Sequence, residues 1–311
     1  MELRHLRYFM AVAEAGHITG AAERLGIQQP PLSRLIKWME RELDVQLFRR
    51  RARGVELTDA GRAFRDRARA LLADFDKAFE VTRSTARGEQ GQICVGVTPT
   101  GPFLAFVPRV IRGFREAYPL VSLTLEERLS SELVEHLRTG RIDSAFLWTP
   151  PAEGLVISAL LQEPLVVAMP RRHPLAQNLS DTRAGLSLRA LADDTFIVYG
   201  RKDGFGLFAA TIVACRTAGF SPRFGQEAPR LATALGLVSI GLGVALVPAS
   251  VQRLRLDGVV YRHLKGPTRP SSTLNLAHRR GDPSAVVRHF VAFVKKAAKA
   301  RADGRGAFAH A

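Results

Sequence analysis

Cysteine is scarce in this sequence of 311 residues, which contains only Cys94 and Cys215. Two cysteines alone do not make a disulfide framework, and they lack the spacing of a zinc site. The N-terminus carries charge from Glu2 onward and has no apolar core typical of a signal peptide. We therefore expect a protein of the reducing cytoplasm.

Long apolar runs are almost absent. One uncharged stretch, 231–249, has the length needed to cross a bilayer. Three glycines and a proline interrupt it, which favours a buried helix, a glycine turn and a strand over 244–247. We therefore expect no membrane partner.

The motifs of common enzyme classes are missing as well: the dinucleotide and P-loop glycine patterns, the G-x-S-x-G elbow and His-rich metal spacings. Glu126 and Glu127 are neighbours on an expected strand, so they point to opposite faces and cannot flank one substrate bond. Cys94 lies in an expected strand with no histidine near it in sequence, which favours a buried structural thiol. We expect no enzyme, no metal and no cofactor.

Basic residues, in contrast, are abundant: 45 Lys and Arg against 29 Asp and Glu give a net charge of +16. The first 90 residues hold 17 basic and 13 acidic side chains, so most of the excess lies in the rest of the chain. This distribution predicts anionic partners for the whole chain, either DNA, a small acid or both.

The first sixty residues have the pattern of a helix-turn-helix. Apolar residues at helical spacing predict a helix that ends near Gly16, followed by a second over 20–25 with Thr19 as its N-cap. A short turn leads to QQPPLSR, where the prolines suit the first turn of a third helix. The third helix buries one stripe: Leu32, Leu35, Ile36, Met39 and Leu43.

In a helix-turn-helix the second of the paired helices enters the DNA major groove N-terminus first. The stretch LFRRRARGVELT, 47–58, then predicts a β-hairpin wing with a basic tip against the phosphate backbone. A solvated run of charge on a loop is the alternative for these arginines. The residues that we expect to contact DNA are Thr19, Gln29, Pro30, Pro31, Ser33, Arg34, Lys37, Arg50, Arg51 and Arg53.

A long helix follows, capped by Thr58 and running over 59–86. Its apolar positions step by three and four, close to a heptad: Ala60, Phe64, Ala68, Leu71, Phe75, Ala78 and Thr82. We interpret it as a dimerising helix. The alternative is a connector packed on its own globular domain.

The stretches LRHLRYFMAVAEAG, ITGAAERLGIQQPPLSRLIKWMERELDVQLFRR and GVELTDAG resemble the winged helix-turn-helix of LysR-type transcriptional regulators. The resemblance covers nearly the whole chain, although Gln28 stands where the family commonly has serine. It implies a DNA-binding domain (1–58), a linker helix (59–87), a hinge (88–91), an effector-binding domain (92–301) and a tail (302–311). That domain would have two lobes, 92–163 with 267–301 and 164–266, with crossings near Glu163 and Gly266.

The residues after 92 alternate between expected strands and helices, which predicts an α/β sheet with helices on both faces. The expected strands are 93–97, 121–125, 144–147, 165–169, 195–199 and 244–247. The expected helices are 103–118, 131–139, 207–218 and 230–240. TPTGPF, 98–103, lies between the first strand and its helix and would hold a carboxylate through hydroxyls and a helix N-terminus.

LysR-type effector domains resemble two-lobed periplasmic binding proteins, so the resemblance implies a cleft between lobes. A plain N-cap role is an equally good interpretation of Ser130. Trp148 stands where some relatives have arginine, so we expect a larger, aromatic or monoanionic ligand. The expected cleft residues are Thr98, Pro99, Thr100, Gly101, Phe103, Ser130, Trp148, Tyr199, Phe205 and Pro248.

ALGLVSIGLGVALVPAS is similar to the matching stretch of family members that sense aromatic acids or muconate-type diacids. The expected function is therefore a sequence-specific transcriptional regulator, an activator, switched by a small carboxylate. Its expected partners are double-stranded promoter DNA, the anionic effector, RNA polymerase if it activates, and further copies in a homodimer or homotetramer. The alternative is a solute-binding protein or small-acid enzyme whose N-terminal helices serve assembly.

Overall fold

The structure is a computed structural model that describes residues 1–52, 54–148, 153–177, 185–201, 206–266 and 270–303. The chain divides into two units, Met1–Ser84 and Thr85–Ala311. The fold is α/β, as predicted, with a helix-turn-helix at its N-terminus.

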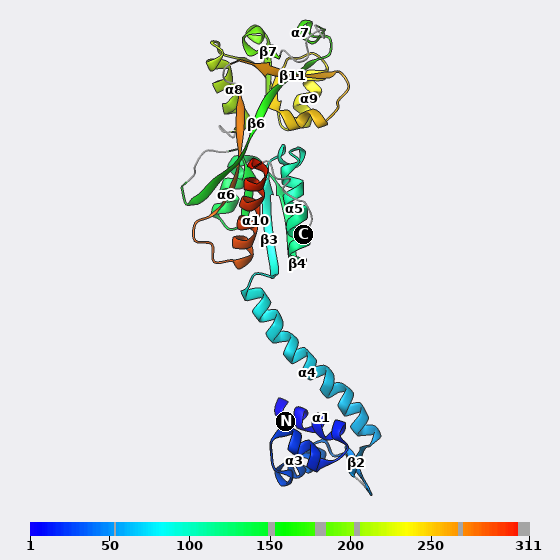
Figure 1. Cartoon of the computed structure of the whole chain (residues 1–311). Helices are drawn as coiled ribbons and strands as arrows, with labels where there is room; N and C mark the ends of the chain where they lie inside the picture. Colours follow the sequence, from blue (N-terminus) through cyan, green and yellow to red (C-terminus); the bar gives the residue numbers. More distant parts are fainter. Residues whose placement is uncertain (53, 149–152, 178–184, 202–205, 267–269, 304–311) are drawn as a thin grey trace. The chain divides into compact units, whose positions relative to one another are not determined.

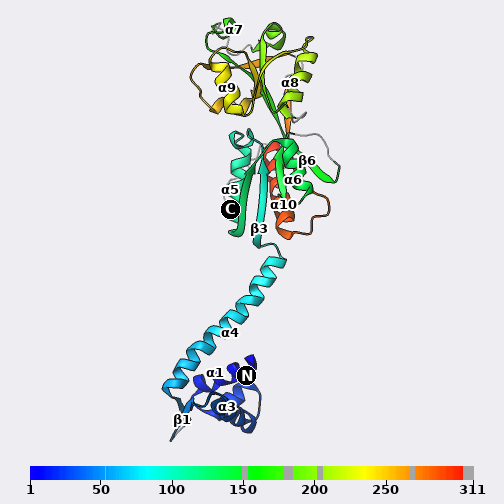
Figure 2. The same ribbon diagram turned by 180° about the vertical axis from the view of Figure 1, so that it is seen from behind.

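The first unit contains the three predicted helices, the hairpin and the long helix (Figures 1 and 2). Its elements are α1 (Leu3–Ala15), α2 (Ile18–Leu25), α3 (Gln29–Leu43), β1 (Phe48–Arg51), β2 (Gly54–Leu57) and α4 (Asp59–Ala86). The core packs α1, α2 and α3 around Phe9, Leu32 and Met39, which are fully buried. Leu32, Leu35, Ile36 and Met39 of the predicted stripe face this core, whereas Leu43, at the end of α3, is exposed, so that part of the prediction is wrong.

Two helix starts test the predicted caps. Thr58 caps α4 as expected, because its Oγ1 accepts a 2.9 Å hydrogen bond from Gly61 N. Thr19 does not cap α2, which begins at Ile18, two residues before the predicted start. His17 is the N-cap instead, and its Nδ1 accepts a 3.0 Å bond from Gly20 N.

The second unit begins with a sheet in which β3 (Gln90–Val97) pairs in parallel with β4 (Leu120–Glu127) and β5 (Ser144–Leu147). Antiparallel β12 (Ser271–Arg279) joins β5 to β6 (Leu155–Pro170). The helices α5 (Phe106–Ala117) and α10 (Ala285–Ala302) pack with Ile93 and Val95 on one face. On the other face α6 (Ser130–Arg138) packs against Cys94.

The strand β6 continues from this first lobe into a second lobe of the same unit, which lies above the first in Figure 1. β6 pairs with β12 up to Pro164, and from Leu165 it pairs with β10 (Ala245–Pro248). The other elements here are α7 (Pro174–Gln177), β7 (Leu186–Ser187), β8 (Thr195–Tyr199), α8 (Gly206–Thr217), β9 (Arg223–Ala228), α9 (Leu231–Ser239) and β11 (Val259–Lys265), with short 3₁₀ turns. α9 and α8 cover opposite faces of β6.

Three expectations about this unit need correction. The strand expected over 165–169 begins at Leu155, because its first half pairs with β12. The expected hinge 88–91 is shorter, because Gln90 and Gly91 already pair with β4. The helix expected from Phe103 begins at Phe106, after a 3₁₀ turn over Gly101–Phe103.

The uncharged stretch 231–249 folds as predicted into a helix, a turn and a strand. In the described part of the chain no helix combines the length and the apolar character needed to cross a membrane.

Candidate functional site

The first candidate site is the exposed face of α3. Gln29, Pro30, Pro31, Arg34 and Lys37 are exposed, and Ser33 is half-buried. The three basic side chains Arg34, Lys37 and Arg41 line a shallow groove with Glu40 and Asp44. Within the described residues no carboxylate lies within ion-pair distance of Arg34 or Lys37. The helix therefore presents two cations and an amide that do not have to break an internal pair to bind a ligand.

Thr19 is exposed on α2, the helix before α3. The prolines occupy the second and third positions of α3, and Gln28 makes no side-chain cap bond. Proline has no N–H, so the first turn exposes fewer unsatisfied donors than an ordinary helix start. Gln28 is thus an N-cap by backbone geometry alone.

The arginines of the wing differ in whether they bind an acidic side chain. Glu56 on β2 accepts a 3.1 Å bond from Arg49 Nε and a 2.7 Å bond from Arg51 Nε. These bonds, Arg49 first, lower the pKa of Glu56 to about 2 and raise the pKa of Arg49. Arg50 points to the other side of the strand and is exposed, with no acidic partner among the described residues. Arg53 lies outside the described residues.

Sequence reasoning missed the residue that attaches the wing. Glu40, on the last turns of α3, accepts hydrogen bonds from Leu47 N at 2.9 Å and Phe48 N at 3.0 Å. Glu40 lies on α3 among both apolar and polar residues. This pattern does not indicate that its carboxylate accepts hydrogen bonds from backbone N–H groups that begin seven residues later. Glu40 therefore fixes the hairpin relative to α3.

The second candidate site is a cleft in the second unit. Thr98, Thr100, Ser130, Trp148 and Tyr199, all predicted, come together around a cavity of about 30 Å³. Among the described residues, the lining consists of Thr98, Pro99, Thr100, Leu129, Ser130, Trp148, Tyr199, Gly200, Gly206 and Leu207. The hydroxyls of Thr98, Thr100 and Ser130 are buried.

Three other predicted cleft residues do not line this cavity. Gly101 is buried in the 3₁₀ turn, and Phe103 packs instead against the core that contains Val166 and Leu231. Pro248 is the last residue of β10 and pairs with Leu165. Phe205 lies outside the described residues. Sequence reasoning missed Leu129, Gly200, Gly206 and Leu207, because none carries a recognisable motif.

The 3₁₀ turn changes the predicted anion site. Gly101 N donates to Thr98 O at 2.8 Å, and Phe103 N donates to Thr100 O at 3.2 Å. These N–H groups are therefore used within the turn, and the predicted helix N-terminus beside Thr98 and Thr100 is wrong. The helix start that reaches the cavity is that of α6, where Leu129 is the N-cap and Ser130 the first helical residue. A plain N-cap role for Ser130 is wrong as well.

Trp148 connects the polar residues of the cleft. Its Nε1 donates to Thr98 Oγ1 at 3.0 Å and to Thr100 Oγ1 at 2.9 Å, and its backbone N donates to Ser130 Oγ at 3.4 Å. Burial raises the pKa of Tyr199, and a hydrogen bond with Thr100 opposes part of this shift. The phenol therefore stays neutral, so the described lining carries no charge.

Comparisons with known proteins match both units of the chain. The family described as bacterial regulatory helix-turn-helix protein, lysR family, matches residues 3–62, and the LysR substrate binding domain matches residues 86–299. The chain is 36% identical over 292 residues to the HTH-type transcriptional regulator AlsR of Bacillus subtilis (strain 168), covering 94% of each chain.

A second relative, the HTH-type transcriptional regulator BudR of Raoultella terrigena, is 35% identical over 293 residues, 94% of this chain and 99% of BudR. The crystal structure of full-length CbnR complexed with its target DNA superposes with a TM-score of 0.80 at 30% identity. That match covers 96% of this chain and all of CbnR.

Proposed function

The chain belongs to the LysR family of transcriptional regulators, which are not enzymes, and on that premise we propose how its residues read DNA and sense an effector. Both units match regulators of this family, so the alternative of a solute-binding protein or small-acid enzyme is wrong. The protein is a DNA-binding regulator with an effector-binding domain. We place it in the cytoplasm.

The observation that carries the DNA-reading proposal is the cationic face of α3, where Arg34 and Lys37 have no acidic partner among the described residues. Gln29 and Arg34 project from its first turns and would contact base edges, with Ser33 and the two prolines alongside. Lys37 on α3 and Arg50 on the wing would contact phosphates, and Thr19 would do so from α2. Arg53 remains part of this proposal from its sequence position.

The linker helix supports a dimer. Beyond Ala68, which is buried, α4 leaves Leu71 57% exposed and Phe79 49% exposed. Phe75 contacts Phe79 edge to face with ring centroids 4.9 Å apart, which extends the apolar stripe. An exposed stripe of this kind on a helix of 28 residues is typical of helix pairing.

We propose the boundaries 1–58 for the DNA-binding domain and 59–87 for the linker helix. The two lobes of the effector-binding domain are then 92–163 with 267–301, and 164–266.

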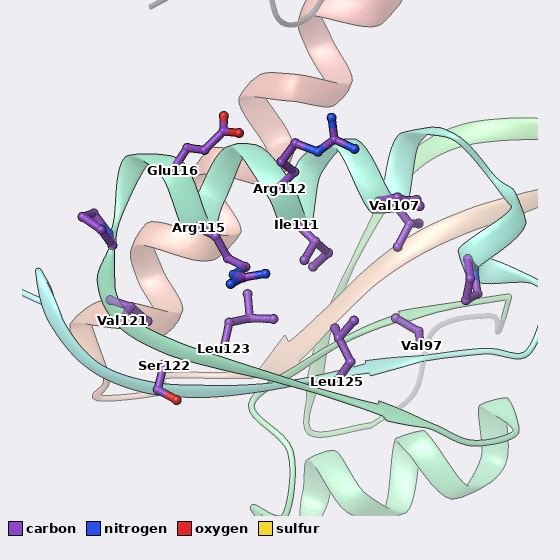
Figure 3. A pocket seen from close by; sticks show the side chains of 13 residues that line it. Val97, Val107, Ile111, Arg112, Arg115, Glu116, Val121, Ser122, Leu123 and Leu125 are labelled. Atoms are coloured by element: carbon purple, nitrogen blue, oxygen red, sulfur yellow. The ribbon is translucent and has the colours of Figure 1, made fainter.

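A groove between α5 and β4 suits a second pairing surface. It has a volume of about 790 Å³, and Figure 3 shows Ile111 facing Leu123 across it while Arg112 and Glu116 point away. β4 is an edge strand on which Leu120 is 64% and Leu125 54% exposed. An apolar edge left uncovered favours pairing with another copy, so a homotetramer follows if both surfaces are used.

The effector proposal places one carboxylate at Thr98, Thr100 and Ser130. Buried hydroxyls can donate to it, and the start of α6 adds the favourable end of a helix dipole. Residues from both lobes of the unit line the cavity. A bound acid would shift the equilibrium between two arrangements of the lobes only if it binds one arrangement more tightly than the other. As an activator the protein would then act on RNA polymerase at its promoter.

Footprinting on the DNA upstream of the protein's own gene, with and without carboxylates, tests this function. We expect two protected half-sites about one helical turn or a multiple apart, because a dimer presents two α3 helices. Binding should weaken steeply with salt, since each phosphate contact releases about 0.9 counterion. Sequence-independent protection with no response to any acid would contradict the proposal.

A further inference from the structure

The last helix of the chain, α10 (orange to red in Figure 1), carries charge of one sign only. Its 18 residues contain three lysines and two arginines and no aspartate or glutamate. In contrast α6, on the other face of the same sheet, combines two glutamates with one arginine. Most of the positive excess of the chain lies after residue 90, yet the described lining of the effector cleft carries no charge. The effector site therefore does not account for the charge of α10.

Four of these cations form a stripe along the exposed side of α10. Arg288, Lys295 and Lys299 are separated by seven and four residues, which places them on one face of the helix, with Lys296 next to them. All four are exposed, whereas Phe290 on the opposite side is fully buried. These four residues, which we call the α10 stripe, extend over about 17 Å of the helix axis.

The α10 stripe has no acidic partner in the part of the chain that the structure describes. Asp282, the acid that precedes the helix, accepts a 2.6 Å hydrogen bond from Arg279 instead. Lys295 and Lys299 lie one turn apart, so their charges repel each other. A bound polyanion would relieve this repulsion, and no internal ion pair would have to break.

The helix dipole accounts for only part of the stripe. Lys299 lies in the last turn of α10, where the dipole favours a cation. Arg288 lies near the opposite end, where the dipole disfavours one, and it donates a 2.8 Å hydrogen bond to the neutral carbonyl oxygen of Pro283. Lys295 and Lys296 lie before the last turn, outside the range of the effect. The stripe as a whole therefore fits an external anion better than it fits the dipole.

The start of α10 lies beside the hinge that attaches the second unit to the long helix α4. Gly88, with φ +71°, lies so close to α10 that a Cβ on it would come within 2.8 Å of Val286 N. The carbonyl oxygen of Gly88 also lies 3.3 Å from His289 Nδ1. A helix of 28 residues is about 42 Å long, so at any hinge angle the stripe stays within about 60 Å of the DNA that the first unit binds.

Such a tether makes a weak contact with DNA effective. A tethered module acts at an effective concentration of about millimolar, so a contact too weak to bind DNA alone still adds to the total affinity. Lysine is a flexible point charge that does not require a fixed phosphate geometry. A duplex carries one negative charge per about 1.7 Å of its axis, so each cation of the stripe would have several phosphates within reach.

We propose that the α10 stripe is a second DNA-contacting surface, which binds the phosphate backbone of the DNA that flanks the site read by α3. The contact is independent of sequence, because phosphates carry no base information. It goes beyond the contacts proposed for α3 and the wing, and it does not depend on the carboxylate switch. It assigns a DNA-binding role to the effector-binding domain itself.

The test uses the full-length protein and two duplexes. One duplex is limited to the footprinted site, and the other adds about twenty base pairs of arbitrary sequence on each side, which exceeds the reach of the tether. The variant Lys295→Gln/Lys296→Gln/Lys299→Gln removes three charges of the stripe. Glutamine forms helices about as well as lysine does, and the three side chains are exposed, so the fold should be kept.

The matched control is Arg171→Gln/Arg172→Gln/Arg253→Gln, which removes three exposed charges from the second lobe. We expect the wild type and this control to bind the longer duplex at least about fivefold more tightly than the short one at about 0.1 M salt. The lysine variant should lose most of this difference and bind the short duplex as the wild type does. Its slope of log K against log salt on the longer duplex should fall by about 0.9 per lost contact.

Arg34→Ala should weaken binding to both duplexes and keep the difference between them, which separates the α10 proposal from the one made for α3. Equal binding of the two duplexes by the wild type, or a full difference in the lysine variant, would overturn the proposal. An equal loss in the control would also overturn it, because net charge rather than the stripe would then act. Unchanged DNA binding with reduced activation of RNA polymerase in the lysine variant would assign the stripe to an acidic protein partner instead.

Discussion

Glu40 on α3 accepts a 2.9 Å hydrogen bond from the backbone N–H of Leu47, at the base of the wing. The same oxygen accepts from the next N–H, and the Leu47 side chain is fully buried. One carboxylate thus joins α3, the helix that we propose reads DNA, to the hairpin beside it.

Replacing Glu40 should detach the wing from α3. In Glu40→Ala two backbone donors lose their acceptor, and we expect the first unit to lose about 1–3 kcal/mol of stability in urea unfolding. Its affinity for cognate DNA should also fall. Glu42→Ala, a change at an exposed neighbour, should remain within about 0.5 kcal/mol of the wild type. Equal stability of the two variants would contradict this role of Glu40.

The first turns of α3 should carry sequence preference. We expect Gln29→Ala and Arg34→Ala each to cost about 1–3 kcal/mol on the cognate site and much less on unrelated duplexes, as lost base contacts do. Competition binding with single-base variants of the operator measures both. A uniform loss on all sequences would instead make these residues phosphate contacts.

The arginines of the wing should contribute equally to the binding of any DNA sequence. Arg50→Ala should reduce the slope of log K against log salt by about one contact, while Arg51→Ala should change it less, because Glu56 already binds Arg51. Glu56→Gln should release Arg49 and Arg51 and strengthen binding to any duplex. An Arg51 effect larger than that of Arg50 would show that the pair opens on DNA.

Acid should affect the wing only at very low pH. The pKa of Glu56 is about 2, below its ordinary value of 4.5, so its pairing stabilises the folded hairpin above pH 4.5 and is lost as the pH falls towards 2. A carboxyl NMR titration should show Glu56 still ionised at about pH 4. An ordinary titration near 4.5 would mean that the arginines are not bound in solution.

The exposed stripe of α4 should hold the dimer. Leu71→Glu places a charge in the proposed helix pair and should yield monomers in sedimentation velocity at micromolar concentration. Lys77→Glu, on the opposite side of the helix, should leave the assembly unchanged. A dimer that survives Leu71→Glu would place the pairing surface elsewhere.

Much of the fold could be predicted because it depends on local periodicity. The stripe of α3, the Thr58 cap and the 28 residues of α4 follow from spacing alone. The short buried strand β5 was predicted with its observed bounds. The cap of α2 was missed because histidine is not among the usual N-cap residues, whereas Thr19 is.

The parts that could not be predicted depend on contacts between distant residues. The first half of β6 is a strand because β12, more than a hundred residues later, pairs with it. The N–H of the Trp148 indole donates to Thr98 and Thr100, which precede it in the sequence by 50 and 48 positions. Sequence reasoning placed these residues in one cleft through family resemblance, but it could not show that the indole fills it.

The central claim is that a carboxylate held by Thr98 and Thr100 switches the protein on DNA. The most direct measurement is a footprint titration with acids from acetate to benzoate and muconate, on the wild type, Thr100→Val and Thr100→Ser. We expect the footprints without acid to be the same, and the acid-dependent change to occur in the wild type and Thr100→Ser but not in Thr100→Val. An undiminished response of Thr100→Val would contradict the account.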